Sequence, residues 1–118
     1  MKKKLTIEEQ LTEAFYSFKS AESDVSYTEN LYFNAEMAYR QAWHDYNQAF
    51  YDYVRQGSPE NHARQHQASE HLSVINQRAN EAKLNYKLAL CRFKKAKKLY
   101  EKLKRKQGKT QGKQPGEI

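Results

Sequence analysis

Apolar residues in the first half of the chain recur at alternating intervals of three and four, and a large side chain usually alternates with a small one. These residues are Leu11, Ala14, Phe18, Ala21, Val25, Thr28, Tyr32, Ala35, Tyr39, Ala42, Tyr46, Ala49 and Tyr53. The second half repeats the spacing at Leu72, Ile75, Ala79, Ala82, Tyr86, Ala89, Phe93, Ala96, Tyr100 and Leu103. Such heptad spacing is typical of a helix that packs along one stripe against another helix. We therefore expect an all-α fold with two long helices.

Local signals predict where these helices begin and end. Thr6 and Glu9 match a capping box, in which each side chain accepts a hydrogen bond from a backbone N–H at the start of a helix. Glycine and proline are absent from there to Gly57, which suits the left-handed residue that closes a helix. Ser58 can then cap the second helix, and Pro59 suits its first position because that position needs no N–H donor.

The expected organisation is one long antiparallel coiled-coil hairpin with an alanine-rich seam, spanning residues 1–107. Helix one covers about residues 6–56, the turn lies at 57–58, and helix two covers about 59–107. Residues 108–118 contain three of the four glycines, a proline and little apolar content. We expect this basic C-terminal tail to be disordered.

The register of the hairpin follows if the chain folds back about Gly57. Residues equidistant from Gly57 then face each other, so Phe18 lies opposite Ala96 and Ala21 lies opposite Phe93. Large side chains therefore meet small ones, as close packing requires. The same register brings opposite charges together on the flanks: Asp24 with Arg92, Asp45 with His71, Asp52 with Arg64, and Glu29 with Lys83.

One seam does not account for all the apolar residues. Phe33 and Met37 fall on the outer face of helix one, and Leu84, Leu88 and Cys91 fall on that of helix two. Helical neighbours of this kind suggest a second interface. We expect it to mediate docking on a partner protein, or self-association into a homodimer with a four-helix bundle.

The net charge of +7 is distributed very unequally along the chain. Residues 1–57 carry a net charge of −3, residues 58–118 carry +10, and only Glu101 opposes thirteen lysines and arginines between residues 83 and 113. Such a block attracts phosphates, an acidic protein surface or anionic lipid. The candidate contacts to nucleic acid or an acidic partner are Arg92, Lys94, Lys95, Lys97, Lys98, Lys102, Lys104, Arg105 and Lys106.

Catalytic and cofactor chemistry finds little support in the sequence. His62 and His66 are spaced for a shared metal ion, but a zinc-enzyme signature is absent and we expect ordinary surface histidines, with no metal and no cofactor. The lone Cys91 cannot form an internal disulfide, which fits a reducing cytoplasm. The chain also lacks an apolar stretch of about 20 residues that could span a membrane. We therefore expect a non-enzymatic cytoplasmic protein.

Two functions from different classes fit these features. The first is an interaction protein that binds a protein or nucleoprotein partner while its basic end contacts DNA or RNA, as in a phage- or plasmid-type inhibitor, an anti-defence protein or an accessory factor. The second is a coiled-coil adaptor or export chaperone that binds protein alone, with the lysines serving solubility or acidic partners. The salt dependence of nucleic-acid binding distinguishes them, because phosphate contacts weaken steeply as salt rises.

Overall fold

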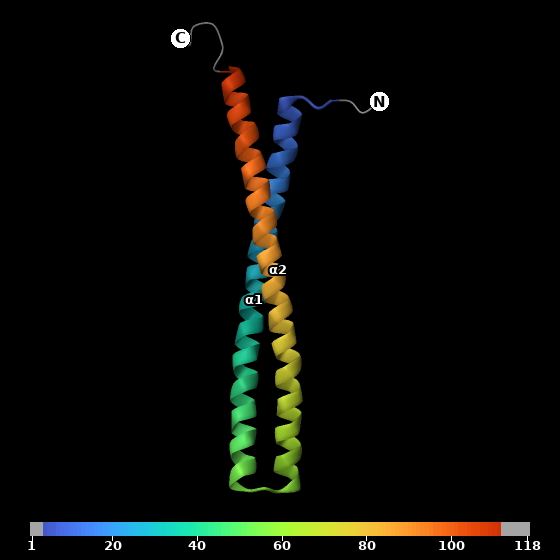
Figure 1. The fold of residues 1–118 in the computed structure, drawn as a ribbon, viewed down its shortest axis with the longest axis vertical. Coiled ribbons are helices and arrows are strands. Elements are labelled where there is room, and N and C mark those ends of the chain that lie inside the picture. Colours follow the sequence, from blue (N-terminus) through green and yellow to red (C-terminus); the bar gives the residue numbers. More distant parts are fainter. Residues whose placement is uncertain (1–3, 112–118) are drawn as a thin grey trace. The chain divides into compact units, whose positions relative to one another are not determined.

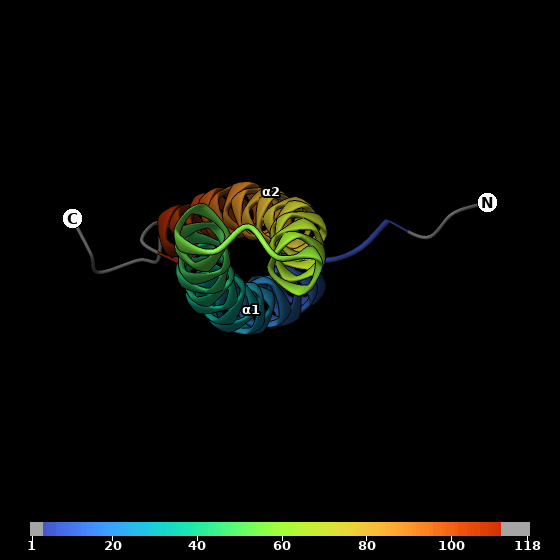
Figure 2. The same cartoon turned by 90° about the horizontal axis from the view of Figure 1, so that it is seen from below.

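The computed structural model describes residues 4–111 and consists of two helices in this range. Helix α1 spans Ile7–Arg55, helix α2 spans Pro59–Gln111, and a short loop joins them (Figure 1). Figure 2 shows this loop crossing from the end of α1 to the start of α2. The predicted all-α helical hairpin is therefore confirmed. The part of the predicted tail at residues 112–118 lies outside the described residues.

Helix α2 extends further than predicted. We expected the tail to begin at residue 108, but α2 continues through Gly108 to Gln111, so that expectation is wrong for residues 108–111. A single glycine costs a helix only about 1 kcal/mol relative to alanine, and it does not by itself end the helix. Lys109 lies in the last turn, where a positive charge interacts favourably with the helix dipole.

Contacts divide the chain into two compact units, each built from facing segments of both helices. The loop unit is Tyr27–Tyr86, and the terminal unit combines Met1–Ser26 with Lys87–Ile118. In both units every predicted seam position is buried or half-buried. The buried core consists mainly of alanine: Ala14, Ala21, Ala89 and Leu103 in the terminal unit, and Ala42, Ala49, Ile75 and Ala79 in the loop unit.

Aromatic rings from the two helices stack on one another between these alanines. In the terminal unit the Phe18 ring stacks on both Phe93 and Tyr100, with centroid separations of 5.4 and 5.6 Å. Phe18 therefore lies between these two rings, at the level of Ala96, as the predicted register requires. In the loop unit Tyr32 stacks on Tyr86 at 5.8 Å. A large side chain on one helix therefore lies directly opposite a small one on the other helix. It stacks on the large side chains that precede and follow that small residue.

Side-chain hydrogen bonds stabilise the loop that connects the two helices. The backbone N–H of Asn61 donates to Ser58 Oγ at 3.1 Å, which is the predicted N-cap of α2. The Asn61 side-chain amide donates to the backbone carbonyls of Gln56 at 2.8 Å and Asp52 at 3.3 Å. Gly57 does not adopt the left-handed conformation we expected. Asn61 instead satisfies carbonyl groups at the end of α1.

Replacing Asn61 by aspartate tests this closure. Asn61→Asp keeps the shape of the side chain but removes both N–H donors and places a carboxylate beside the carbonyl end of α1. We expect the free energy of unfolding to fall by about 1–2 kcal/mol. Asn80→Asp, an equal charge change at an exposed position of α2, should have little effect in the same urea titration. Equal losses for both variants would contradict the assigned role of Asn61.

The alanine seam makes a second prediction about stability. Ala42 and Ala89 are 2% and 3% exposed, so a leucine at either position overpacks a close contact between the helices. We expect Ala42→Leu or Ala89→Leu to reduce the free energy of unfolding by about 1–3 kcal/mol. Ala38→Leu, the same change at an exposed position of α1, serves as the control. A loss at Ala38 as large as at Ala42 would show that the seam is misassigned.

Candidate functional site

The basic segment of α2 lies in the terminal unit, and all nine predicted contact residues there are exposed. They are Arg92, Lys94, Lys95, Lys97, Lys98, Lys102, Lys104, Arg105 and Lys106. The seam residues Phe93, Ala96, Tyr100 and Leu103 face α1, so the basic side chains cover the rest of the helix surface. A subset that we call the basic stripe recurs at intervals of three and four on the side opposite the seam: Lys95, Lys98, Lys102 and Arg105.

Charge is segregated between the two units. The terminal unit carries sixteen lysines and arginines against seven acidic residues, whereas the loop unit carries five against seven. Consecutive turns of α2 place like charges at i and i+4, as at Lys94, Lys98 and Lys102. Each such pair destabilises an isolated helix by roughly 0.2–0.5 kcal/mol. The positive field is thus maintained at a cost in helix stability.

The two aromatic rings within the basic segment itself, Phe93 and Tyr100, are occupied by packing. Phe93 and Tyr100 stack on Phe18, and Tyr100 also packs against Phe15 at a centroid distance of 5.8 Å. The Lys104 ammonium lies 5.7 Å from the centre of the Tyr100 ring, where the ring face attracts the cation. The segment therefore presents charge to a ligand, rather than open rings on which bases could stack.

The five predicted interface residues are all exposed, but they fall in different units. Phe33, Met37 and Leu84 belong to the loop unit, whereas Leu88 and Cys91 belong to the terminal unit. We therefore describe them as two separate sets. In the loop unit Phe33 and Met37 lie on neighbouring turns of α1, and their side chains are 64% and 51% exposed.

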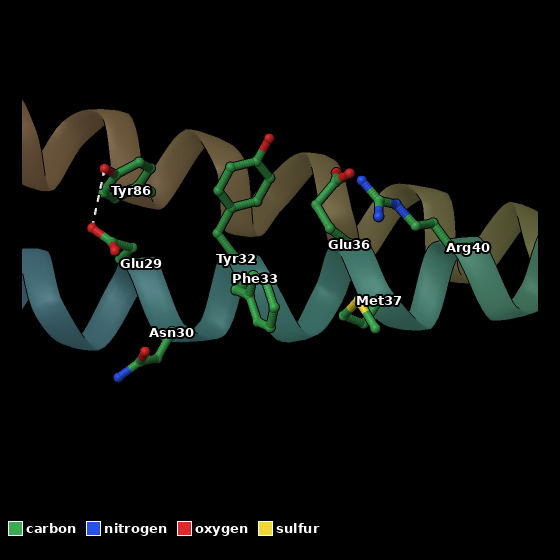
Figure 3. Close-up of a pocket in the computed structure, with 8 residues that line it drawn as sticks. All are labelled: Glu29, Asn30, Tyr32, Phe33, Glu36, Met37, Arg40 and Tyr86. Atoms are coloured by element: carbon green, nitrogen blue, oxygen red, sulfur yellow. Dashed lines mark hydrogen bonds between the residues drawn. The ribbon is translucent and has the colours of Figure 1, made fainter.

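Phe33 and Met37 line an open groove of about 530 Å³ in the loop unit (Figure 3). The polar residues that line this groove were not among the predicted site residues. The seven-residue spacing of Glu29 and Glu36 could have indicated that both carboxylates lie on the same side of α1. The Tyr86 hydroxyl of α2 donates to the Glu29 carboxylate of α1 at 3.3 Å. The other lining residues are Asn30, Tyr32 and Arg40.

Opposite charges meet on the flanks in part as the register predicts. Arg64 Nη1 lies 3.5 Å from Asp52 Oδ2, which confirms that pair. Asp24 and Arg92 line one surface depression of the terminal unit, and Asp45 and His71 line another in the loop unit. These exposed contacts help to specify register more than stability, because a surface ion pair contributes only about 0.2–1 kcal/mol.

His62 and His66, the two histidines spaced for a shared metal ion, lie in the loop unit and each contacts another side chain there. His66 Nε2 is 3.1 Å from Glu70 Oε1, and the His62 ring packs against Tyr53 at a centroid distance of 5.3 Å. Within residues 4–111 the side chains do not bring together three or more histidine, cysteine, aspartate or glutamate residues suited to a metal ion.

Comparison with known proteins does not assign the chain to a class. No protein family, curated protein or solved structure matches it. Over the described part of the chain, neither helix is long and apolar enough to cross a membrane.

The contact between Tyr86 and Glu29 makes a prediction about titration. Partial burial, together with the negative charge and hydrogen bond of Glu29, raises the pKa of Tyr86, so its hydroxyl keeps its proton to higher pH than usual. Glu29→Gln removes the charge but leaves the burial, so we expect the pKa of Tyr86 to fall part of the way back. NMR titration of ¹³C-labelled tyrosine, with Tyr86→Phe for assignment, measures this. Glu36→Gln makes the same charge change seven residues further along α1 and should change the pKa of Tyr86 less. An equal change in that pKa would contradict the contact between Tyr86 and Glu29.

Proposed function

We propose that this protein is a small non-enzymatic interaction protein of the cytoplasm that binds a nucleoprotein partner. Its basic segment on α2 contacts DNA or RNA, while its exposed apolar residues contact protein. Binding acts sterically and electrostatically by occupying or reinforcing a nucleic-acid path in the partner. This is the mode of a phage- or plasmid-type inhibitor, such as an anti-defence protein, or of an accessory factor.

The observation that carries this proposal is the exposure of nine basic side chains on one helical segment with a single opposing residue, Glu101. A solvated helix face usually mixes both signs of charge, because i and i+4 pairs of opposite charge stabilise the helix. The segment from Arg92 to Lys106 instead repeats one sign at that spacing. Phosphate binding accounts for such a pattern better than solubility does.

The chemistry of the segment favours contacts to the backbone over recognition of bases. Seven of the nine residues are lysines, which act as flexible point charges, and only Arg92 and Arg105 offer the planar fork suited to a guanine edge. The nearby rings of Phe93 and Tyr100 are stacked within the protein. We therefore expect binding with little sequence preference and a strong dependence on salt.

Neutralising the basic stripe tests the proposal. In a variant carrying Lys95→Gln, Lys98→Gln, Lys102→Gln and Arg105→Gln, the seam stays intact, so we expect unchanged helicity by circular dichroism. Affinity for a duplex or single-stranded oligonucleotide should fall by about tenfold or more at low salt. The slope of log affinity against log salt should flatten by roughly 0.7–0.9 for each phosphate contact removed.

The control variant carries the same loss of charge in the loop unit, through Arg55→Gln, Arg64→Gln, Arg78→Gln and Lys83→Gln. All four of these positions are exposed. This variant should keep most of the affinity, because the change in net charge is equal and only its location differs. Failure of the wild-type protein to bind any nucleic acid at low salt would overturn the proposal and favour the protein-binding adaptor or export chaperone.

A further inference from the structure

A second heptad repeat runs along α1 within the loop unit, on the side opposite the seam. Eight residues follow intervals of three and four, and we call them the outer stripe: Tyr27, Asn30, Asn34, Met37, Gln41, His44, Gln48 and Tyr51. All eight side chains are exposed, with Tyr27 and Tyr51 at 65% and 66%. The outer stripe contains no aspartate, glutamate, lysine or arginine.

The acidic residues of α1 in this unit lie on its flanks, and the outer stripe ends at Tyr51 because the next position of the same spacing is Arg55, the last residue of α1. Glu29 and Glu36 are one heptad apart beside the seam, and Glu29 contacts Tyr86 of α2. Asp45 and Asp52 are one heptad apart on the opposite flank, and Asp52 contacts Arg64 of α2. The outward face of a two-helix coiled coil normally carries most of its charge. The eight residues of the outer stripe are uncharged, so another helix can pack on them without burying a charge.

The outer stripe is chemically self-complementary when two copies run antiparallel about a two-fold axis at the level of Tyr39. Residues equidistant from Tyr39 then face each other across the axis, and three of the four pairs join side chains of similar chemistry. The outermost pair joins two tyrosine rings, and the next two pairs join an amide to an amide and an amide to an imidazole. The pair nearest the axis joins a thioether to an amide. The pairs between one copy and the other are Tyr27 with Tyr51, Asn30 with Gln48, Asn34 with His44, and Met37 with Gln41.

We propose that the outer stripe of α1 is the interface of a homodimer, in which two copies pair antiparallel about this axis. Among the eight residues of the outer stripe itself, a partner recognised by charge would find no complementary group. A second copy supplies its own uncharged, amide-rich and aromatic face, as an isologous interface requires. The loop unit is also where two copies of a +7 chain repel each other least, because it carries five basic and seven acidic residues.

Side-chain hydrogen bonds already orient part of the outer stripe. The amide of Gln41 donates to Asp45 Oδ1 at 3.0 Å, and that of Gln48 donates to Asp52 Oδ1 at 3.3 Å. An amide has two N–H donors and a carbonyl with two lone pairs, so each glutamine retains capacity to bond across the axis. Polar residues at such positions specify partner number and register while reducing stability. The dimer is therefore expected to be specific in register and concentration-dependent.

Two charged side chains adjoin the outer stripe, Arg55 at its end and Arg40 near its centre. The antiparallel register brings Arg40 close to its own copy beside the axis. In Figure 3 the Arg40 side chain extends toward Glu36 of its own helix. Because this like-charge contact opposes association, Arg40→Gln should strengthen the dimer.

Sedimentation equilibrium of the full chain, freed of nucleic acid by nuclease and high salt, tests the interface. The wild-type protein should change from monomer to dimer as its concentration rises. Tyr51→Glu should raise the dimer dissociation constant by about tenfold or more, because two carboxylates are then placed in the interface without partners. Tyr16→Glu is the matched control, since Tyr16 has the same heptad position on α1, lies in the terminal unit and is 68% exposed.

A pair of double variants tests the register. Asn30→Lys with Gln48→Glu creates two attractive pairs in the antiparallel dimer, whereas Asn30→Glu with Gln48→Glu creates two repulsive ones. The first should dimerise at least as tightly as the wild type, the second should be monomeric, and high salt should narrow the difference. A wild-type protein that stays monomeric, equal losses from Tyr51→Glu and Tyr16→Glu, or weak association of both double variants would each overturn the proposal. The experiment contains no nucleic acid, so its result is independent of the proposed function.

Discussion

The structure depends on the close approach that alanine permits between two helices. Ala14 and Ala21 are buried, and their small side chains leave room for Tyr100 and Phe93 of the opposite helix to stack on Phe18. Aromatic pairs of this kind contribute roughly 0.5–1.5 kcal/mol each beyond the area that they bury. A larger residue at the alanine positions would separate the helices and remove the stacking, so the two features stabilise the fold only together.

A seam between two helices buries only one stripe of each. Among the described residues, no large side chain is completely buried, and fifteen large hydrophobic residues are exposed. The function that we propose therefore rests on what the outward faces present, which is positive charge on α2 in the terminal unit and an uncharged stripe on α1 in the loop unit.

The two outward faces differ because different constraints act on them. The flanks of the seam take the charges that help to set register, such as Asp52 opposite Arg64. Positions further from the seam are free of that constraint, and there the composition of each unit reflects its proposed partner. In the basic segment the proposed partner is a phosphate backbone, which tolerates variation in position. On the outer stripe it is a second helix, which requires heptad spacing.

The sequence by itself determined the helices, the seam and the register, because heptad periodicity and a helix breaker at Gly57 act over short distances. It also placed the basic segment at exposed positions, since residues off the seam of a two-helix fold have nowhere to be buried. The tertiary structure decided which side chains form hydrogen bonds with each other or with the backbone. Asn61 closes α1 because the fold brings its amide to the carbonyl of Gln56, a meeting that no local pattern encodes. The Tyr86 hydroxyl likewise finds Glu29 only because the helices approach closely enough for both to reach. Spacing along one chain specifies which face is buried, but which atoms meet depends on the distance and rotation between two helices.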